Sequence, residues 1–183
     1  MTVLLFQVVM KMLLCCSLAL LLVLSCLKDV KSRAIPLSSC SVNVHTQELQ
    51  KYYSDIRSDL LAGDNEIGTR TYTDVFTRLH QEGQMCCFMH LLMRFYIERV
   101  FSSYTSPQPI NQRCSSALAN AFVTIKRDIH KCHCHCGEET HRKIDSIHAE
   151  FTKLQVDTAA RKAMGELNVV LEWLEGLGQN PAS

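Results

Sequence analysis

Apolar and polar positions alternate with a helical period over most of the chain. From Cys40 onward, apolar side chains recur every three or four residues, beginning with Val42 and Leu49, and this spacing predicts amphipathic helices. The predicted helices cover approximately residues 46–60, 86–104, 111–131, 138–154 and 158–177. Residues 69–76 are weakly strand-like, but no partner strand is evident. The pattern therefore predicts an all-α, single-domain bundle of about six amphipathic helices.

Glycine and proline mark the expected ends of these helices. Residues 62–68 contain Gly63 and Gly68 and have the composition of a loop. Pro107 and Pro109 are expected to end the second helix, and Gly176 and Gly178 the last one. Gly165 falls inside the predicted last helix, where glycine costs ~1 kcal/mol relative to alanine, so we expect close helix packing there. Trp173 lies on the apolar stripe of the same helix and is expected in the core.

The N-terminal segment has the pattern of a secretory signal peptide. Lys11 precedes the uncharged apolar residues 12–24, which are short for a membrane span. Val23 and Ser25 suit positions −3 and −1, so cleavage is expected near Ser25–Cys26, give or take several residues. Residues 1–26 are then the signal peptide and 27–183 the mature, secreted domain, which contains no membrane segment. The alternative is an uncleaved signal-anchor.

The charge balance and the cysteine count limit the possible functions. The chain has 19 Lys and Arg against 18 Asp and Glu, so it lacks the basic character typical of nucleic-acid binding. Its ten cysteines fall to seven after cleavage. A secreted chain favours disulfides, and an odd number leaves one thiol without an intramolecular partner.

The seven mature cysteines suggest a framework of three disulfides. Cys86 and Cys87 are neighbours on a predicted helix, so their side chains point about 100° apart and are poorly placed to bond each other. Two of Cys132, Cys134 and Cys136 offer partners within one short loop, and Cys40 would take the third. Spacing leaves the order of pairing open. Cys114 is left over as a free thiol.

The same loop also permits a metal-binding interpretation. Four histidines and three cysteines crowd into twelve residues, a density typical of zinc or copper tracts. The single-residue gaps between the cysteines are tighter than those of most structural zinc sites, and secretion favours oxidation. A secreted metal-binding protein is therefore the alternative function. Its ligands would be His130, Cys132, His133, Cys134, His135, Cys136 and His141.

Four blocks of sequence resemble the interleukin-10 cytokine family, and within it the interleukin-20 subfamily. They are Cys86-Cys87 with residues 90–101, residues 116–128, the Cys-His-Cys-Gly-Glu-Glu run of residues 134–139, and residues 162–174. With Cys40 and residues 54–57, the resemblance covers nearly all of the mature chain. The paired cysteines and residues 134–139 are its most specific features.

The resemblance implies a disulfide-stapled helical cytokine bundle that signals by binding. It implies the disulfides Cys40–Cys132, Cys86–Cys134 and Cys87–Cys136. It also implies a monomer that bridges two chains of an interleukin-20-receptor-like class II cytokine receptor and activates Janus kinases and STAT factors. The receptor-binding candidates are the loop residues Asp64, Ile67 and Arg70. Arginine often dominates such interfaces, which favours Arg70 over Asp64.

Other functions receive little or no support from the sequence. It lacks a Gly-rich phosphate loop, a His-Glu-x-x-His motif and a Gly-x-Ser-x-Gly motif, so we expect no enzyme and no cofactor. The absence of an Asn-x-Ser/Thr sequon predicts no N-glycosylation. Basic residues near the cysteine loop make heparan sulphate a possible ligand, although acidic residues are interspersed among them. These candidates are Lys126, Arg127, Lys131, Arg142 and Lys143.

Overall fold

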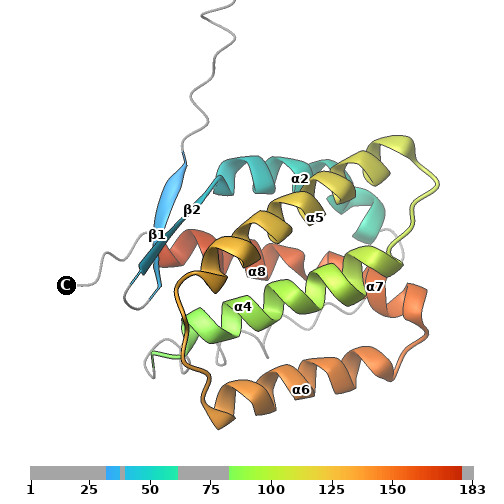
Figure 1. The fold of residues 1–183 in the computed structure, drawn as a ribbon. Coiled ribbons are helices and arrows are strands. Elements are labelled where there is room, and N and C mark those ends of the chain that lie inside the picture. The colour runs from blue at the N-terminus through green and yellow to red at the C-terminus, as the bar shows by residue number, and fades with distance from the viewer. Residues whose placement is uncertain (1–31, 38–39, 62–82, 179–183) are drawn as a thin grey trace, which may run out of the picture. The chain divides into compact units, whose positions relative to one another are not determined.

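The computed structural model describes residues 32–37, 40–61 and 83–178, all of which belong to the unit Ser32–Ser183. Helices dominate these residues, so the predicted helical bundle is confirmed (Figure 1). The elements are β1 (Arg33–Leu37), β2 (Cys40–Val44), α2 (Thr46–Leu61), α4 (Met85–Phe95), η1 (Tyr96–Phe101), α5 (Pro109–His130), α6 (Glu138–Thr152), α7 (Val156–Gly165) and α8 (Leu167–Leu177).

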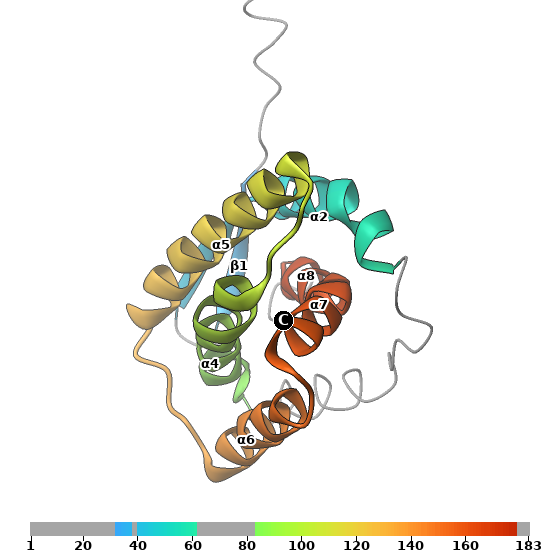
Figure 2. The same cartoon turned by 90° about the vertical axis from the view of Figure 1, so that its right-hand side faces the viewer.

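The last helix lies in the middle of the bundle. In Figure 2, α2, α5, α4 and α6 are arranged around α7 and α8, and α5 packs against both α2 and α4. Seven of the eleven residues of α8 are buried, because its apolar residues cover more than one face. Trp173 is 6% exposed and its ring lies 5.9 Å from that of Phe88, so its predicted place in the core is confirmed.

A β-hairpin precedes the first described helix, and the prediction of a chain without strands was wrong here. β1 and β2 pair antiparallel, with Ile35 opposite Val42. Alternate residues are buried on one face of the hairpin, namely Ile35, Leu37, Val42 and Val44. This is the period of two that a half-buried strand requires. Val42, which we counted in the first helical repeat, therefore belongs to a strand.

The predicted last helix is two helices, α7 and α8, which meet at Glu166. The close packing expected at Gly165 is also wrong, because a Cβ built there has no heavy atom within 4 Å. The role of Gly165 lies in its backbone instead. Its carbonyl oxygen accepts a hydrogen bond of 2.7 Å from the buried Tyr53 hydroxyl, and the helix break leaves that carbonyl free to do so.

The second predicted helix also differs from the expectation. α4 continues into the π-helix η1, whose Phe101 packs edge-on against Phe122 of α5 with ring centroids 5.2 Å apart. Pro109 does not end this helix. It is the first residue of α5, a position where the missing N–H of proline costs little.

Three predictions concern residues outside the described ranges. The signal peptide, the loop at 62–68 and the strand-like stretch at 69–76 all belong to this group. Within the described ranges, no helix combines the length and the apolar character needed to cross a membrane.

Candidate functional site

Three disulfides tie four elements together at one end of the bundle. Cys40, the first residue of β2, bonds Cys132 just beyond α5. Cys86 and Cys87, in the first turn of α4, bond Cys134 and Cys136 ahead of α6. The Cα atoms of the three pairs lie 5.6, 5.5 and 5.3 Å apart, within the usual range for disulfides. These are the pairs that the resemblance implies, and we call this end the disulfide end.

The loop between α5 and α6 directs its cysteines to different partners. His133 has φ of +50°, a left-handed conformation that is uncommon for a residue other than glycine. The residue before it, Cys132, still belongs to the turn that ends α5, because its N–H donates a hydrogen bond of 2.9 Å to the Ile129 carbonyl. The reversal at His133 separates Cys132, which bonds β2, from Cys134, which bonds α4.

The same disulfides remove the thiols from the proposed metal tract. Cys132, Cys134 and Cys136 are oxidised, so only imidazoles remain there as soft ligands. Within the described parts of the chain, no three His, Cys, Asp or Glu side chains converge as metal ligands would.

Cys114 is the described cysteine that forms no disulfide, and it is buried. Its Sγ lies 4.0 Å from Oδ2 of Asp55 on α2. Burial, followed by the Asp55 carboxylate, raises the pKa of the thiol. A buried and protonated thiol is poorly placed to link two copies of the chain.

Asp59 gathers three helices at the other end of α5. Its carboxylate accepts hydrogen bonds from Asn111 Nδ2 at 2.8 Å and Gln108 Nε2 at 3.2 Å. Its backbone carbonyl accepts one from Arg161 Nη1 of α7 at 3.5 Å. We call this the Asp59 end. Our sequence reasoning missed these residues, and no sequence signal marks them beyond Asn111 lying in the first turn of a helix.

A polar hollow of about 300 Å³ lies beside the Asp59 end and shares Arg161 with it. Tyr104 is almost fully buried there, and burial raises the pKa of its hydroxyl. The hollow is therefore lined mainly by groups able to form hydrogen bonds. The residues around it are Ser103, Tyr104, Thr105, Asp157, Thr158 and Arg161.

The receptor-binding candidates Asp64, Ile67 and Arg70 lie outside the described residues. α2 ends at Leu61, two residues after Asp59 and three before Asp64. The described structure therefore fixes the point at which their segment begins.

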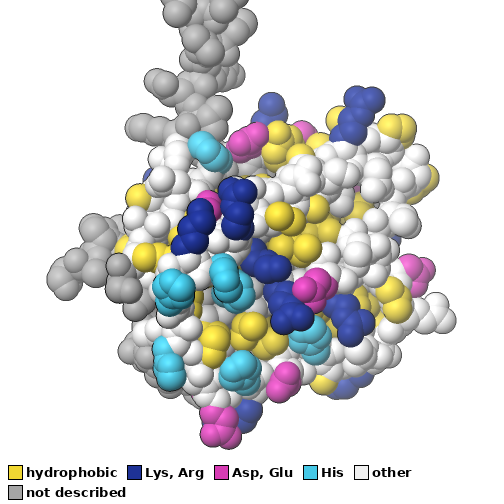
Figure 3. Space-filling model, in the orientation of Figure 1, with side chains coloured by type: hydrophobic (Ala, Val, Ile, Leu, Met, Phe, Trp, Pro, Cys, Tyr) yellow, Lys and Arg dark blue, Asp and Glu magenta, His cyan; other side chains and the backbone are white. Residues whose placement is uncertain are grey.

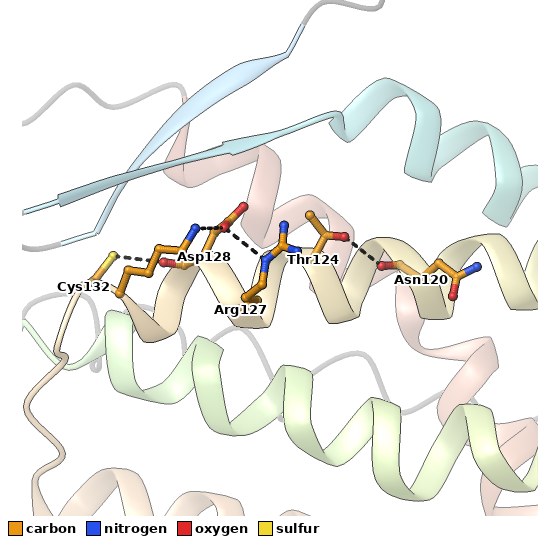
Figure 4. A network of polar contacts seen from close by, with 6 residues as sticks. Asn120, Thr124, Arg127, Asp128 and Cys132 are labelled. Atoms are coloured by element: carbon orange, nitrogen blue, oxygen red, sulfur yellow. Dashed lines mark hydrogen bonds and ion pairs between the residues drawn. The ribbon is translucent and has the colours of Figure 1, made fainter.

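Charged side chains line the outer face of α5 near the disulfide end. Asp128 lies between Lys131, at 2.7 Å, and Arg127, at 3.6 Å (Figure 4). The hydrogen bond from Lys131 is the main reason why the pKa of Asp128 is lowered. On α6, Glu139 similarly pairs with Arg142 at 2.6 Å and Lys143 at 3.7 Å. Four of the five heparan sulphate candidates thus contact a carboxylate.

His90 and His130 stack across α4 and α5 on the same face. Their ring centroids are 5.6 Å apart and the rings are inclined by 29°. Partial burial lowers the pKa of His90, and His130, Lys126 and Arg94 lower it further. At neutral pH His90 therefore favours its uncharged form.

Comparison with known proteins agrees with the helical fold. The interleukin 10 family model matches residues 13–178. The chain is 38% identical to interleukin-20 of Mus musculus over 78% of this chain and 84% of that protein. It is 28% identical to interleukin-19 of Homo sapiens over 75% of this chain and 81% of that protein.

Two solved structures share the architecture. Human interleukin-19 superposes with a TM-score of 0.61 and 27% identity, covering 72% of this chain and 88% of that one. An edited human interleukin 24 superposes with a TM-score of 0.60 and 28% identity, covering 78% and 94%. Both cover most of the solved chain, so the likeness extends over a whole domain rather than a single helical pair.

Proposed function

This chain belongs to the interleukin-10 family, and from that premise we propose that it bridges two different class II cytokine receptor chains. Bringing the two chains together would activate their Janus kinases and STAT factors in immune and epithelial cells. The observation that carries this proposal is the 38% identity to an interleukin-20 over 84% of that protein's length. The receptor expected on this basis is the heterodimeric interleukin-20 receptor or one similar to it.

The family already fixes the broad class of activity. Interleukins of this family are cytokines, which are not enzymes, and they bind class II cytokine receptors. The interleukin relatives are secreted, and residues 1–26 supply the corresponding signal peptide in our proposal. The mature chain, residues 27–183, would act outside the cell as a monomer.

The contacts at the two ends of α5 support this function because they fix the orientation of the helices that would contact the receptor chains. The disulfide end joins β2, α4, α5 and the start of α6. The Asp59 end joins α2, α5 and α7 just before the segment that carries Asp64, Ile67 and Arg70. A receptor-bridging protein needs two patches at a fixed angle, and a bundle held at both ends provides it. We propose that one patch comprises α2, these loop residues and the last helices, and that the other uses α2 with a neighbouring face.

A reconstituted signalling assay tests the proposal. The secreted mature protein is added to cells that express both chains of the interleukin-20 receptor, or either chain alone, and STAT phosphorylation is measured. We expect a dose-dependent signal only when both chains are present. If interleukin-20 activates these cells and the protein does not, this receptor assignment is wrong.

A single substitution tests the loop candidates. Arg70→Ala should weaken receptor binding by about tenfold, because arginine anchors commonly contribute more than 1 kcal/mol to an interface. Binding is measured on immobilised receptor ectodomains, and the melting temperature should not change. Lys153→Ala, an exposed change beyond the end of α6, is the control. Unchanged affinity in Arg70→Ala would remove this residue from the interface.

A further inference from the structure

Histidines concentrate on one face of the bundle. Six of the seven histidines in the described residues lie on α4, α5, α6 or the loop between α5 and α6. Figure 3 shows histidine side chains intermixed with lysines and arginines over these elements. We call this surface the histidine face. Its histidines are His90, His130, His133, His135, His141 and His148.

The stacked pair His90 and His130 forms the centre of the histidine face. The charged groups that act on His90 are His130 and Lys126 from α5 and Arg94 from its own helix, and none of them is a carboxylate. Arg94 forms an ion pair with Glu98 at 2.9 Å. Among the described residues Lys126 forms no ion pair. The centre thus offers positive charge to a ligand from two helices.

Carboxylates offset much of the fixed positive charge around this centre. Asp128 on α5 pairs with Arg127 and Lys131, and Glu139 on α6 pairs with Arg142 and Lys143. Glu138 opens α6 and Asp145 lies further along it. Fixed charges alone therefore leave this face only weakly positive at neutral pH. Because the face holds six histidines, its charge at lower pH depends mainly on their protonation.

We propose that the histidine face binds sulphated glycosaminoglycan chains such as heparan sulphate, and that binding strengthens as the pH falls below neutral. The first proposed receptor patch uses α2, the loop after it and the last helices, whereas this site lies on α4, α5, α6 and the loop between α5 and α6. A linear polysulphate suits the ridge between α4 and α5, where sulphate groups can contact Arg94 and Lys126 and then Arg127 and Lys131. Each sulphate bound near His90 or His130 stabilises the protonated imidazole, so binding and proton uptake are coupled.

An anionic membrane is the competing ligand, and the surface fits it less well. Peripheral membrane binding adds buried apolar side chains to charge attraction. Among the described residues four large apolar side chains are exposed. Ile110 lies at the opposite end of α5, and Leu154 and Val156 flank the turn between α6 and α7. Val123 alone lies on α5 close to Lys126. One side chain provides little apolar anchorage, whereas a polysulphate needs none.

Heparin affinity measured against pH tests the proposal. Binding of the secreted mature protein to a size-defined heparin oligosaccharide is titrated at pH 7.4, 6.5 and 5.5 over a range of salt concentrations. We expect affinity to rise about tenfold between pH 7.4 and 5.5, with a steeper dependence on salt as more cations contact the chain. Equal affinity at all three pH values would overturn the proposal.

Substitutions distinguish the contribution of histidine protonation to heparin affinity from that of the lysine and arginine charges. The double variant His90→Gln/His130→Gln should keep the affinity measured at pH 7.4 and lose most of the rise at pH 5.5. Lys126→Ala should bind several-fold more weakly at every pH. Lys162→Ala, on α7 behind this face, is the matched control and should bind as the parent does. An intact rise in the double histidine variant would overturn the role of this pair.

Vesicle binding and receptor signalling are the remaining measurements. Vesicles containing phosphatidylserine are titrated over the same pH range, and tighter binding to them than to heparin would assign the face to membranes instead. All variants are also tested for STAT activation in heparan-sulphate-deficient cells that carry both receptor chains, where parental activity is expected. Loss of heparin binding with normal signalling, or the reverse, shows which of the two proposals has failed.

Discussion

The two ends of α5 are held by different kinds of interaction. At its C-terminal end, Cys132 and the loop that follows are joined covalently to β2 and α4. At its N-terminal end, Gln108 and Asn111 are held by hydrogen bonds to one carboxylate, that of Asp59. α5 has 22 residues and is therefore about 33 Å long, so the two ends are far apart.

This difference predicts different responses to mutation. A disulfide stabilises the fold mainly by restricting the unfolded chain, so its loss lowers stability without leaving an unpaired group in the native state. Asn111 is 1% exposed, so loss of Asp59 leaves a buried amide without this acceptor. The disulfide end contributes more in total, and the Asp59 end depends mainly on its buried partner, Asn111.

The largest effect is expected from breaking the bond that closes the longest loop. Cys40 and Cys132 are 92 positions apart, and the double variant Cys40→Ala/Cys132→Ala should lower the free energy of unfolding by about 3 kcal/mol. Urea denaturation of the secreted protein measures this change. The exposed neighbour Ser41 supplies the control Ser41→Ala, which should leave stability nearly unchanged. A loss below about 1 kcal/mol in the cysteine variant would contradict a large contribution of the disulfide end to stability.

The next effect comes from the Asp59 end. Asp59→Ala should cost about 2 kcal/mol, because Asn111 is then buried with its amide unsatisfied. Gln108→Ala removes an exposed partner of the same carboxylate and should cost far less. A double-mutant cycle over Asp59→Ala and Asn111→Ala measures the coupling directly and should give about 1 kcal/mol. Additive effects would show that this carboxylate does not hold α5.

The disulfide end is also the part of the site that could be predicted from the sequence. Cysteine is a residue type whose pairing follows from compartment and spacing, so Cys86 and Cys87 could be directed to the loop at 132–136. The order of pairing stayed open in that reasoning, and the family resemblance supplied it. The helices were predictable for a related reason, because their apolar repeats are local in sequence.

The Asp59 end could not be predicted because its contacts are distant in sequence and chemically ordinary. Asp59 lies 49 positions from Gln108 and 102 from Arg161, and such pairs leave no local pattern. The hairpin is a different case. Its alternation at Ile35, Leu37, Val42 and Val44 was visible, but Val42 also fitted the helical repeat that begins with Leu49. Two five-residue strands are too short to outweigh that longer pattern.

The smallest expected effect concerns the pH dependence of stability near the disulfide end. The folded-state pKa of His90 is lowered from the ordinary value of 6.5 by burial and by the neighbouring basic groups His130, Lys126 and Arg94. Around and below pH 6.5, the imidazole of residue 90 is therefore protonated more often in the unfolded chain than in the folded one. Native stability should therefore fall as the pH decreases from 7.5 through 6.5 toward the lowered pKa, and His90→Gln should reduce this fall.

Thermal unfolding at pH 7.5, 6.5 and 5.5 measures the effect on the melting temperature. Lys126→Met removes one of the neighbouring cations and should reduce the acid sensitivity in part, whereas Lys162→Met on α7 should leave it unchanged. Saturating heparin oligosaccharide should reverse the sign, because a polysulphate bound to the histidine face stabilises the protonated imidazoles. If heparin leaves the acid sensitivity of the parent protein unchanged, then protons and sulphates do not act at the same place. The His90–His130 pair would then only be a structural contact between α4 and α5.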